Sequence, residues 1–246
     1  QDPGSALAGS DDLLKAMDSS GVAQSVILGF AWRNPLTLRL HNDTVLAAAV
    51  EHSDRFIPFT CVFPFDKNAA AEAERCFELG AAGIGEVGLY DRDIDAEYIE
   101  ALKPVMKVCL DRGKLLMLHV NEPIGHPYCG KAPITIRGIY NFVKTYPENR
   151  IILAHWGGGL LFFASLKKEI GKALKNVWFD TAASPYLYDP SIWKAAAELI
   201  GADRILFGTD YPLLTPERYL AEAEGSGLKP DELERIFFRN AQQVLA

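Results

Sequence analysis

Several features are absent from this sequence, and each absence removes a class of protein. No apolar stretch approaches the roughly 20 residues needed to span a bilayer, so we expect no membrane-spanning helix. The chain has no excess of basic residues, because 25 Lys and Arg stand against 32 Asp and Glu. The resulting net charge of −7 argues against a nucleic-acid or anionic-membrane partner.

Cysteine pairs and a targeting segment are also missing. The four cysteines, Cys61, Cys76, Cys109 and Cys129, lack the C-x-x-C spacing of a metal or redox motif, so we expect reduced thiols and a cytoplasmic location. Residues 1–5 contain neither an initiator Met nor the apolar core of a signal peptide. We therefore expect that the beginning of the protein is missing from this sequence.

The composition that remains is that of a globular α/β protein. With 246 residues, of which 49% are hydrophobic, the chain can bury a large core. We expect one domain over residues 1–246.

Short apolar runs of strand character alternate with helical patterns along the chain. Strands are expected to start near residues 25, 56, 83, 114, 150, 176 and 204. This regular alternation favours parallel βαβ units and a (β/α)8 TIM barrel whose first strand is absent from the sequence. An open doubly wound sheet explains the alternation equally well, but its functional residues concentrate at one switch point.

Four of the runs end on a residue that can bind a metal or carry a proton. These residues are Glu86, His119, His155 and Asp210. Because the carboxyl ends of barrel strands face one cavity, their imidazole and carboxylate groups would form a divalent metal site. Taken singly, each residue has an ordinary explanation, such as a hydrogen-bonded structural histidine or a helix-capping aspartate.

Other polar and aromatic residues lie in the loops on the same side. Arg33, His126 and Lys131 could bind a substrate carboxylate or phosphate, or remain solvated. Trp156 precedes three glycines, which either let an anion approach a helix N-terminus or form a tight turn.

The remaining candidates complete the expected binding site and its surroundings. Trp32, Asn121 and Tyr211 join the substrate-binding group, and the aromatic loop residues suggest a small, partly planar substrate. We expect Asp180 and Thr181 to support the site rather than bind metal.

The sequence resembles the amidohydrolase superfamily, specifically its amidohydrolase-2 type of TIM-barrel metal-dependent hydrolases. The matching pieces are LMLHVN at residues 116–121, ILAHWGG at 152–158, ILFGTDYP at 205–212 and RNA at 239–241. The resemblance implies that His119 binds metal, that His155 is a ligand or catalytic histidine, and that Asp210 binds metal and shuttles a proton.

The segment GEVGL at residues 85–89 is similar to a strand of TatD-type metal hydrolases, in which the Glu binds metal. This similarity implies that Glu86 supports a second metal. The sequence departs from the family in one respect, because the His-x-His of the family's first strand occurs nowhere in it.

These observations predict a metal-dependent hydrolase of the amidohydrolase superfamily. One or two Zn²⁺ ions, or Mn²⁺ instead, would activate water against an amide, ester or lactone of a small molecule, with Asp210 and His155 as catalytic residues. The alternative is a non-oxidative decarboxylase of the aminocarboxymuconate-semialdehyde type, with Arg33 as the anchor. A TatD-like nuclease and a metal-poor scaffold protein are weaker alternatives, and a homo-oligomer is left open.

Overall fold

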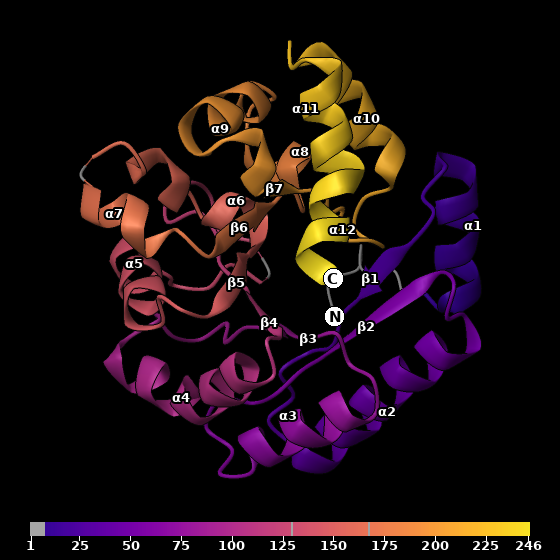
Figure 1. The fold of residues 1–246 in the computed structure, drawn as a ribbon, viewed down its shortest axis with the longest axis vertical. Helices are drawn as coiled ribbons and strands as arrows, with labels where there is room; N and C mark the ends of the chain where they lie inside the picture. The colour runs from indigo at the N-terminus through magenta and orange to yellow at the C-terminus, as the bar shows by residue number, and fades with distance from the viewer. Residues whose placement is uncertain (1–7, 129, 167) are drawn as a thin grey trace.

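The computed structural model describes residues 8–128, 130–166 and 168–246, and shows a curled parallel sheet surrounded by helices (Figure 1). The strands are β1 (Ser25–Ile27), β2 (Phe56–Thr60), β3 (Gly83–Val87), β4 (Leu115–Leu118), β5 (Arg150–Leu153), β6 (Val177–Asp180) and β7 (Ile205–Leu206). Each strand pairs in parallel with the next in sequence order. This order is that of a TIM barrel and excludes the doubly wound alternative, in which the strand order reverses at a switch point.

The helices alternate with the strands as predicted. They are α1 (Ser10–Ser20), α2 (Pro35–Glu51), α3 (Ala69–Glu78), α4 (Ala96–Asp111), α5 (Ile136–Thr145), α6 (Ala154–Gly157), α7 (Lys168–Ala173), α8 (Ser184–Leu187), α9 (Ile192–Ile200), α10 (Pro216–Gly225), α11 (Pro230–Glu234) and α12 (Asn240–Leu245). Three short segments, η1 (Leu160–Phe163), η2 (Ala202–Arg204) and η3 (Arg235–Arg239), have other helical geometries.

Local sequence signals set where the long helices begin. At the start of α2, the Asn34 side chain accepts hydrogen bonds from two backbone N–H groups and Pro35 occupies the first helical position. At the start of α4, Asp95 accepts a hydrogen bond from the backbone of Tyr98. These caps direct each chain segment from a strand end back along the outside of the sheet.

Two helix predictions need correction. The sequence predicts a helical stretch over residues 94–112 that Pro104 kinks or restarts, but the helix does not restart there, since α4 runs unbroken from Ala96 to Asp111. The sequence also predicts a terminal helix over residues 230–245, but this segment is not one regular helix, because η3 is a π-helical turn between α11 and α12. Within this wider turn, the carbonyl of Ile236 accepts a hydrogen bond at 3.1 Å from the backbone N–H of Phe207, the residue that directly follows β7.

The core has an inner and an outer part, because successive strand residues point to opposite faces. In β4, Leu115 and Met117 belong to a cluster inside the curl, whereas Leu116 and Leu118 pack beneath the surrounding helices. The side chains of β4 are therefore buried on both faces, which explains its continuous apolar sequence.

The curl is open between its first and last strands. Within the described part of the chain, β1 pairs only with β2, and β7 pairs only with β6. The C-terminal helix, yellow in Figure 1, lies beside this opening, between β7 and α1. Asn240, at the start of α12, donates hydrogen bonds to the carbonyl oxygens of Ala202 and Ile205, at 2.7 Å each. The opening is where the further strand of a closed eight-stranded barrel would lie.

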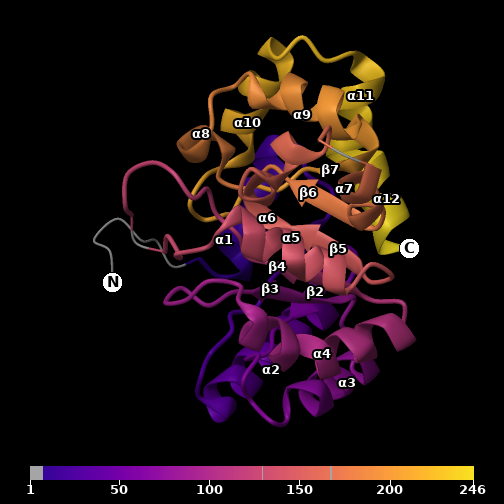
Figure 2. The ribbon, with the colours of Figure 1, turned by 90° about the vertical axis from the view of Figure 1, so that its left-hand side faces the viewer.

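A side view of the molecule shows on which side the loops that follow the strands project. The long loop between β4 and α5 projects on one side of the molecule, and the C-terminus lies on the opposite side (Figure 2). The strand ends predicted to carry functional residues therefore share the side on which the longest loop projects.

Two sequence expectations concern the chain as a whole. No helix among the described residues is both long and apolar enough to cross a membrane. Cys61, Cys76 and Cys109 are buried free thiols, and Cys129 lies outside the described residues.

Candidate metal centre

Three of the four predicted strand-end residues converge. Glu86 belongs to β3, His119 directly follows β4, and His155 is the second residue after β5. The Glu86 carboxylate oxygen Oε1 lies 2.9 Å from Nδ1 of His119 and 3.5 Å from Nε2 of His155. One donor atom from each residue lies within 4.8 Å of the others, so the group could hold a metal ion.

The three side chains affect one another's protonation. Burial raises the pKa of Glu86, but the charges and hydrogen bonds of His119 and His155 outweigh it and hold that pKa well below its usual range. Burial lowers the pKa of His155, but the hydrogen bond and charge of Glu86 outweigh this effect and raise it to about 10. Without a metal, His155 therefore carries a proton at neutral pH.

The hydrogen bonding of His119 is incomplete without a further partner. Its Nε2 atom is buried and has no hydrogen-bond partner among the described residues. If Nδ1 carries the proton, a lone pair on Nε2 is stranded; if Nε2 carries it, the Nδ1 lone pair faces an anionic carboxylate. Because a buried unpaired polar atom is costly, the group fits a bound cation better than an empty site.

The backbone after β5 forms a left-handed turn of five residues. His155 and Trp156 have φ of 55° and 56°, and Gly157, Gly158 and Gly159 continue with positive φ. A non-glycine residue pays about 1–2 kcal/mol for this conformation. Among the described residues, the non-glycines with positive φ are His155, Trp156, Ala183 and Asp210, all just beyond strand ends. Such strain concentrates at functional sites.

This turn decides between the two interpretations of the three glycines. A Cβ on Gly157 would lie 2.5 Å from the ring of Phe179, and one on Gly158 would lie 2.6 Å from the Asn121 carbonyl oxygen. The glycines therefore allow close packing inside the protein, as the tight-turn interpretation expects. The regular helix expected to open here is replaced by this turn and the short helix η1.

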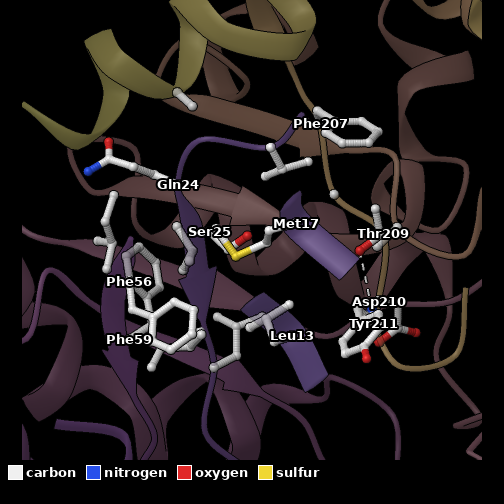
Figure 3. Close-up of a pocket in the computed structure, with 18 of the residues that line it drawn as sticks. Leu13, Met17, Gln24, Ser25, Phe56, Phe59, Phe207, Thr209, Asp210 and Tyr211 are labelled. Carbon is white, nitrogen blue, oxygen red and sulfur yellow. Dashed lines mark hydrogen bonds between the residues drawn. The ribbon is translucent and has the colours of Figure 1, made fainter. Parts of the chain in front are cut away.

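Asp210, the fourth predicted ligand, lines a cavity but does not belong to the group formed by Glu86, His119 and His155, which we call the metal group. It follows β7 and lines a cavity of about 1110 Å³, together with Glu86 and His155, and this cavity extends into the opening between β1 and β7. Figure 3 shows Asp210 on the cavity wall beside Thr209 and Tyr211. Burial raises the pKa of Asp210, the charge of His155 opposes the shift, and the charge of Glu86 adds to it. Among the described residues, the metal group contains three of the four predicted ligands.

The segment carrying Asp210 is held by neighbouring strands. Thr181, after β6, donates a hydrogen bond to the Gly208 carbonyl at 2.8 Å and accepts one from Gly208 N at 3.0 Å. Tyr219 donates a hydrogen bond to the Thr209 carbonyl at 2.6 Å. The supporting role predicted for Thr181 agrees with these contacts.

Three predicted substrate-binding residues have side chains that form hydrogen bonds within the protein. Trp156 is fully buried, and its indole N–H donates to Ser184. Asn121 is buried, and its side chain bonds both the N–H and the carbonyl of Ala132, which closes the loop between β4 and α5. Lys131 donates to Glu122 and to two backbone carbonyls, so its three ammonium hydrogens are used within that loop. Sequence position alone could not reveal these partners.

The other predicted binding residues remain accessible. Trp32 is exposed and contacts Phe30 and His41, while Arg33 pairs with the exposed Asp91. His126 is exposed in the β4–α5 loop. Tyr211 is half-buried and lines the cavity.

Tyr90 is a site residue that the sequence interpretation missed. Its ring lies 5.0 Å from that of His119, and although 45% of the residue is exposed, its partial burial followed by the charges of Glu86 and Asp210 raises its pKa. Tyr90 places a phenol, neutral at neutral pH as tyrosine ordinarily is, next to the metal group. Its position four residues after Glu86, in the loop that leaves the same strand end, was the available signal.

Comparison with known proteins places the chain in a family. The amidohydrolase family profile matches residues 5–246, whereas no curated protein sequence matches the chain. The 5-carboxyvanillate decarboxylase from Sphingomonas paucimobilis has a similar structure, with a TM-score of 0.77 and 18% identity over 98% of this chain and 83% of that one.

Two further solved structures are similar at low identity. The dihydroxybenzoic acid decarboxylase from Polaromonas, with bound manganese and 2-nitroresorcinol, has a TM-score of 0.76 and 21% identity over 97% of this chain and 86% of that one. The 2,6-dihydroxybenzoate decarboxylase from Rhizobium has a TM-score of 0.73 and 20% identity over 97% and 88%. The structural likeness establishes the fold, and the profile match over nearly the whole chain shows that this protein belongs to the amidohydrolase family.

Proposed function

We propose that this protein is a metal-dependent decarboxylase that releases CO2 from a small hydroxylated aromatic carboxylate. The observation that carries the proposal is the convergence of Glu86, His119 and His155 beside a cavity that Glu86, His155 and Asp210 line. The decarboxylases of similar structure support this substrate class over the amide, ester or lactone of a hydrolase.

Glu86, His119 and His155 are the residues that would hold the metal. A divalent cation held there would supply positive charge that stabilises the acidic groups of the substrate. Two imidazoles and one carboxylate suit both Zn²⁺ and Mn²⁺, so we propose that either ion supports binding.

Asp210 is the proposed proton carrier. As the bond between the ring and the carboxylate breaks, its electron pair remains on the ring carbon, which takes a proton from the Asp210 carboxyl group. The raised pKa of Asp210 favours this role, because it increases the fraction of protonated carboxyl near neutral pH. Solvent then returns the proton, and the overall reaction converts a carboxylate and one proton into the arene and CO2.

The walls of the cavity suit a planar anion. Tyr211 lines the cavity beside Asp210, and the Tyr90 ring lies 5.0 Å from that of His119, so both offer aromatic surface near the metal group. The Arg33 side chain is 65% exposed and its partner among the described acidic residues is the exposed Asp91, so it could exchange this weak surface pair for a second acidic group of the substrate.

A direct assay tests the proposal against hydrolysis. Protein loaded with Mn²⁺ or Zn²⁺ is incubated with ortho-hydroxybenzoates and, separately, with aryl esters and lactones. We expect CO2 release from at least one hydroxybenzoate, and a loss of about 10²–10⁴-fold in kcat for Asp210→Asn. Ester or lactone hydrolysis without CO2 release would overturn the decarboxylase assignment in favour of a hydrolase.

A further inference from the structure

A buried carboxylate outside the proposed chemistry contacts the most strained part of the metal group. Asp180 ends β6, is only 4% exposed and lies on the wall of the same cavity. Its Oδ1 atom accepts hydrogen bonds from the backbone N–H of His155, at 2.8 Å, and of Ala182, at 3.0 Å. One carboxylate oxygen thus joins the end of β6 to the left-handed turn after β5.

The hydrogen bond from Ala182 to Asp180 also helps to place the His155 ring. The carbonyl oxygen of Ala182 lies 3.0 Å from Nδ1 of His155. Because a carbonyl oxygen can only accept, Nδ1 must carry a proton. Nε2 faces Glu86, with a proton while the ring is charged and with a lone pair for a metal once that proton is displaced. Asp180 therefore fixes the His155 backbone directly and the ring through the segment that holds Ala182.

Two further contacts of the turn come from the same region. The Trp156 indole donates to Ser184, and the Tyr188 hydroxyl lies 3.5 Å from the His155 carbonyl oxygen. Because His155 and Trp156 are unfavourable in this backbone conformation, they need partners that exist only when the turn is formed. Among these partners, Asp180 is the charged one, and hydrogen bonds to a charged group are the stronger kind.

We propose that Asp180 is a positioning residue that holds His155 in its left-handed conformation and orients its Nε2 atom toward the metal group. The inference rests on the proposed function for its purpose, but its test requires no catalytic activity.

The variants are Asp180→Ala, which removes the acceptor, and Asp180→Asn, which retains an oxygen able to accept both N–H groups. Asn240→Ala is the matched control, because it also removes two hydrogen bonds of a buried side chain but lies against β7. Two quantities are measured: hydrogen exchange of the His155 amide in the metal-free protein, and the Kd for Zn²⁺ by titration.

For Asp180→Ala we expect the His155 amide to exchange at least tenfold faster than in Asn240→Ala, and Zn²⁺ binding to weaken about 10–100-fold. Asp180→Asn is expected to keep the His155 amide exchange rate and the Kd for Zn²⁺ close to their wild-type values. The proposal is overturned if Asp180→Ala matches Asn240→Ala in both measurements.

The wild-type protein supplies a test even if Asp180→Ala does not fold. In the Zn²⁺-loaded protein, imidazole nitrogen NMR should show a proton on Nδ1 of His155, and a proton on Nε2 instead would overturn the proposal. If no variant or wild type releases CO2 but these results hold, the positioning role stands and the proposed function fails.

Discussion

At the scale of single residues, the protonation of His155 governs how the site takes up a metal. Its pKa of about 10 arises from Glu86 despite burial, so below that pH the metal-free site holds a proton on the ring. A metal ion needs the neutral ring, and binding must therefore displace the proton.

We predict that about one proton is released per metal ion bound at pH 8. Calorimetric titration in two buffers with different ionisation enthalpies measures this number. Glu86→Gln removes the carboxylate that raises the pKa of His155, so the same titration should show weaker binding and fewer protons released. Wild-type binding without proton release would contradict the assigned protonation state.

The same shift makes the stability of the metal-free protein depend on pH. The folded-state pKa of His155 is raised from 6.5 to about 10, so its stabilising contribution is complete below pH 6.5 and is lost as the pH rises toward 10. We expect the free energy of unfolding to fall over this range more steeply in the wild type than in Glu86→Gln. Urea unfolding at several pH values measures this free energy. An equal pH dependence in the wild type and in Glu86→Gln would show that Glu86 does not raise the pKa of His155.

At the scale of elements, the left-handed turn after β5 depends on glycine for two reasons. Gly158 has φ of 58°, and a Cβ there would also lie 2.6 Å from the Asn121 carbonyl oxygen. Gly21, after α1, has φ of 69°, but a Cβ on it would meet no neighbouring atom within 4 Å. The two sites separate the cost of the backbone conformation from the cost of the collision.

We predict that Gly21→Ala lowers the free energy of unfolding by about 1–2 kcal/mol, the cost of the left-handed conformation alone. Gly158→Ala should cost about 1–3 kcal/mol more, because a backbone carbonyl must also move. Urea denaturation of both variants measures the difference. Equal losses would mean that the contact between the turn and Asn121 is not close.

At the scale of the whole molecule, the metal group joins three separate strand ends. A ligand that binds only the folded state stabilises it by mass action, which amounts to about 2.7 kcal/mol at a free concentration 100 times its Kd. For a chain of this size, that corresponds to a rise in Tm of roughly 5–11 °C.

We predict such a rise on addition of Zn²⁺ or Mn²⁺, measured by thermal unfolding followed by circular dichroism. His119→Ala should remove most of it, since the group then loses one of its two imidazoles. An equal rise in wild type and His119→Ala would place the bound metal elsewhere in the protein.

Much of the architecture could be predicted because its signals are periodic and local. The strand that ends on His119 reads as an apolar run, and the structure buries it on both faces. Glu86, His119 and His155 could be grouped in advance because parallel strands bring their ends to one side of the sheet. The roles of Asn121 and Lys131 could not be predicted from the sequence, since their hydrogen-bond partners depend on how one loop folds back on itself.

The sequence by itself determined the alternation of strands and helices, the parallel direction of the strands and the residues at the strand ends, while the order of the strands was decided by the structure. Only the tertiary structure decided that Trp156 is buried, that Tyr90 faces the metal group and that His155 adopts a left-handed backbone. The physical reason is the range of the interactions. Hydrophobic periodicity acts within a few residues, whereas His155 is held by Asp180, 25 positions away, through a bond that exists only after β5 and β6 have paired.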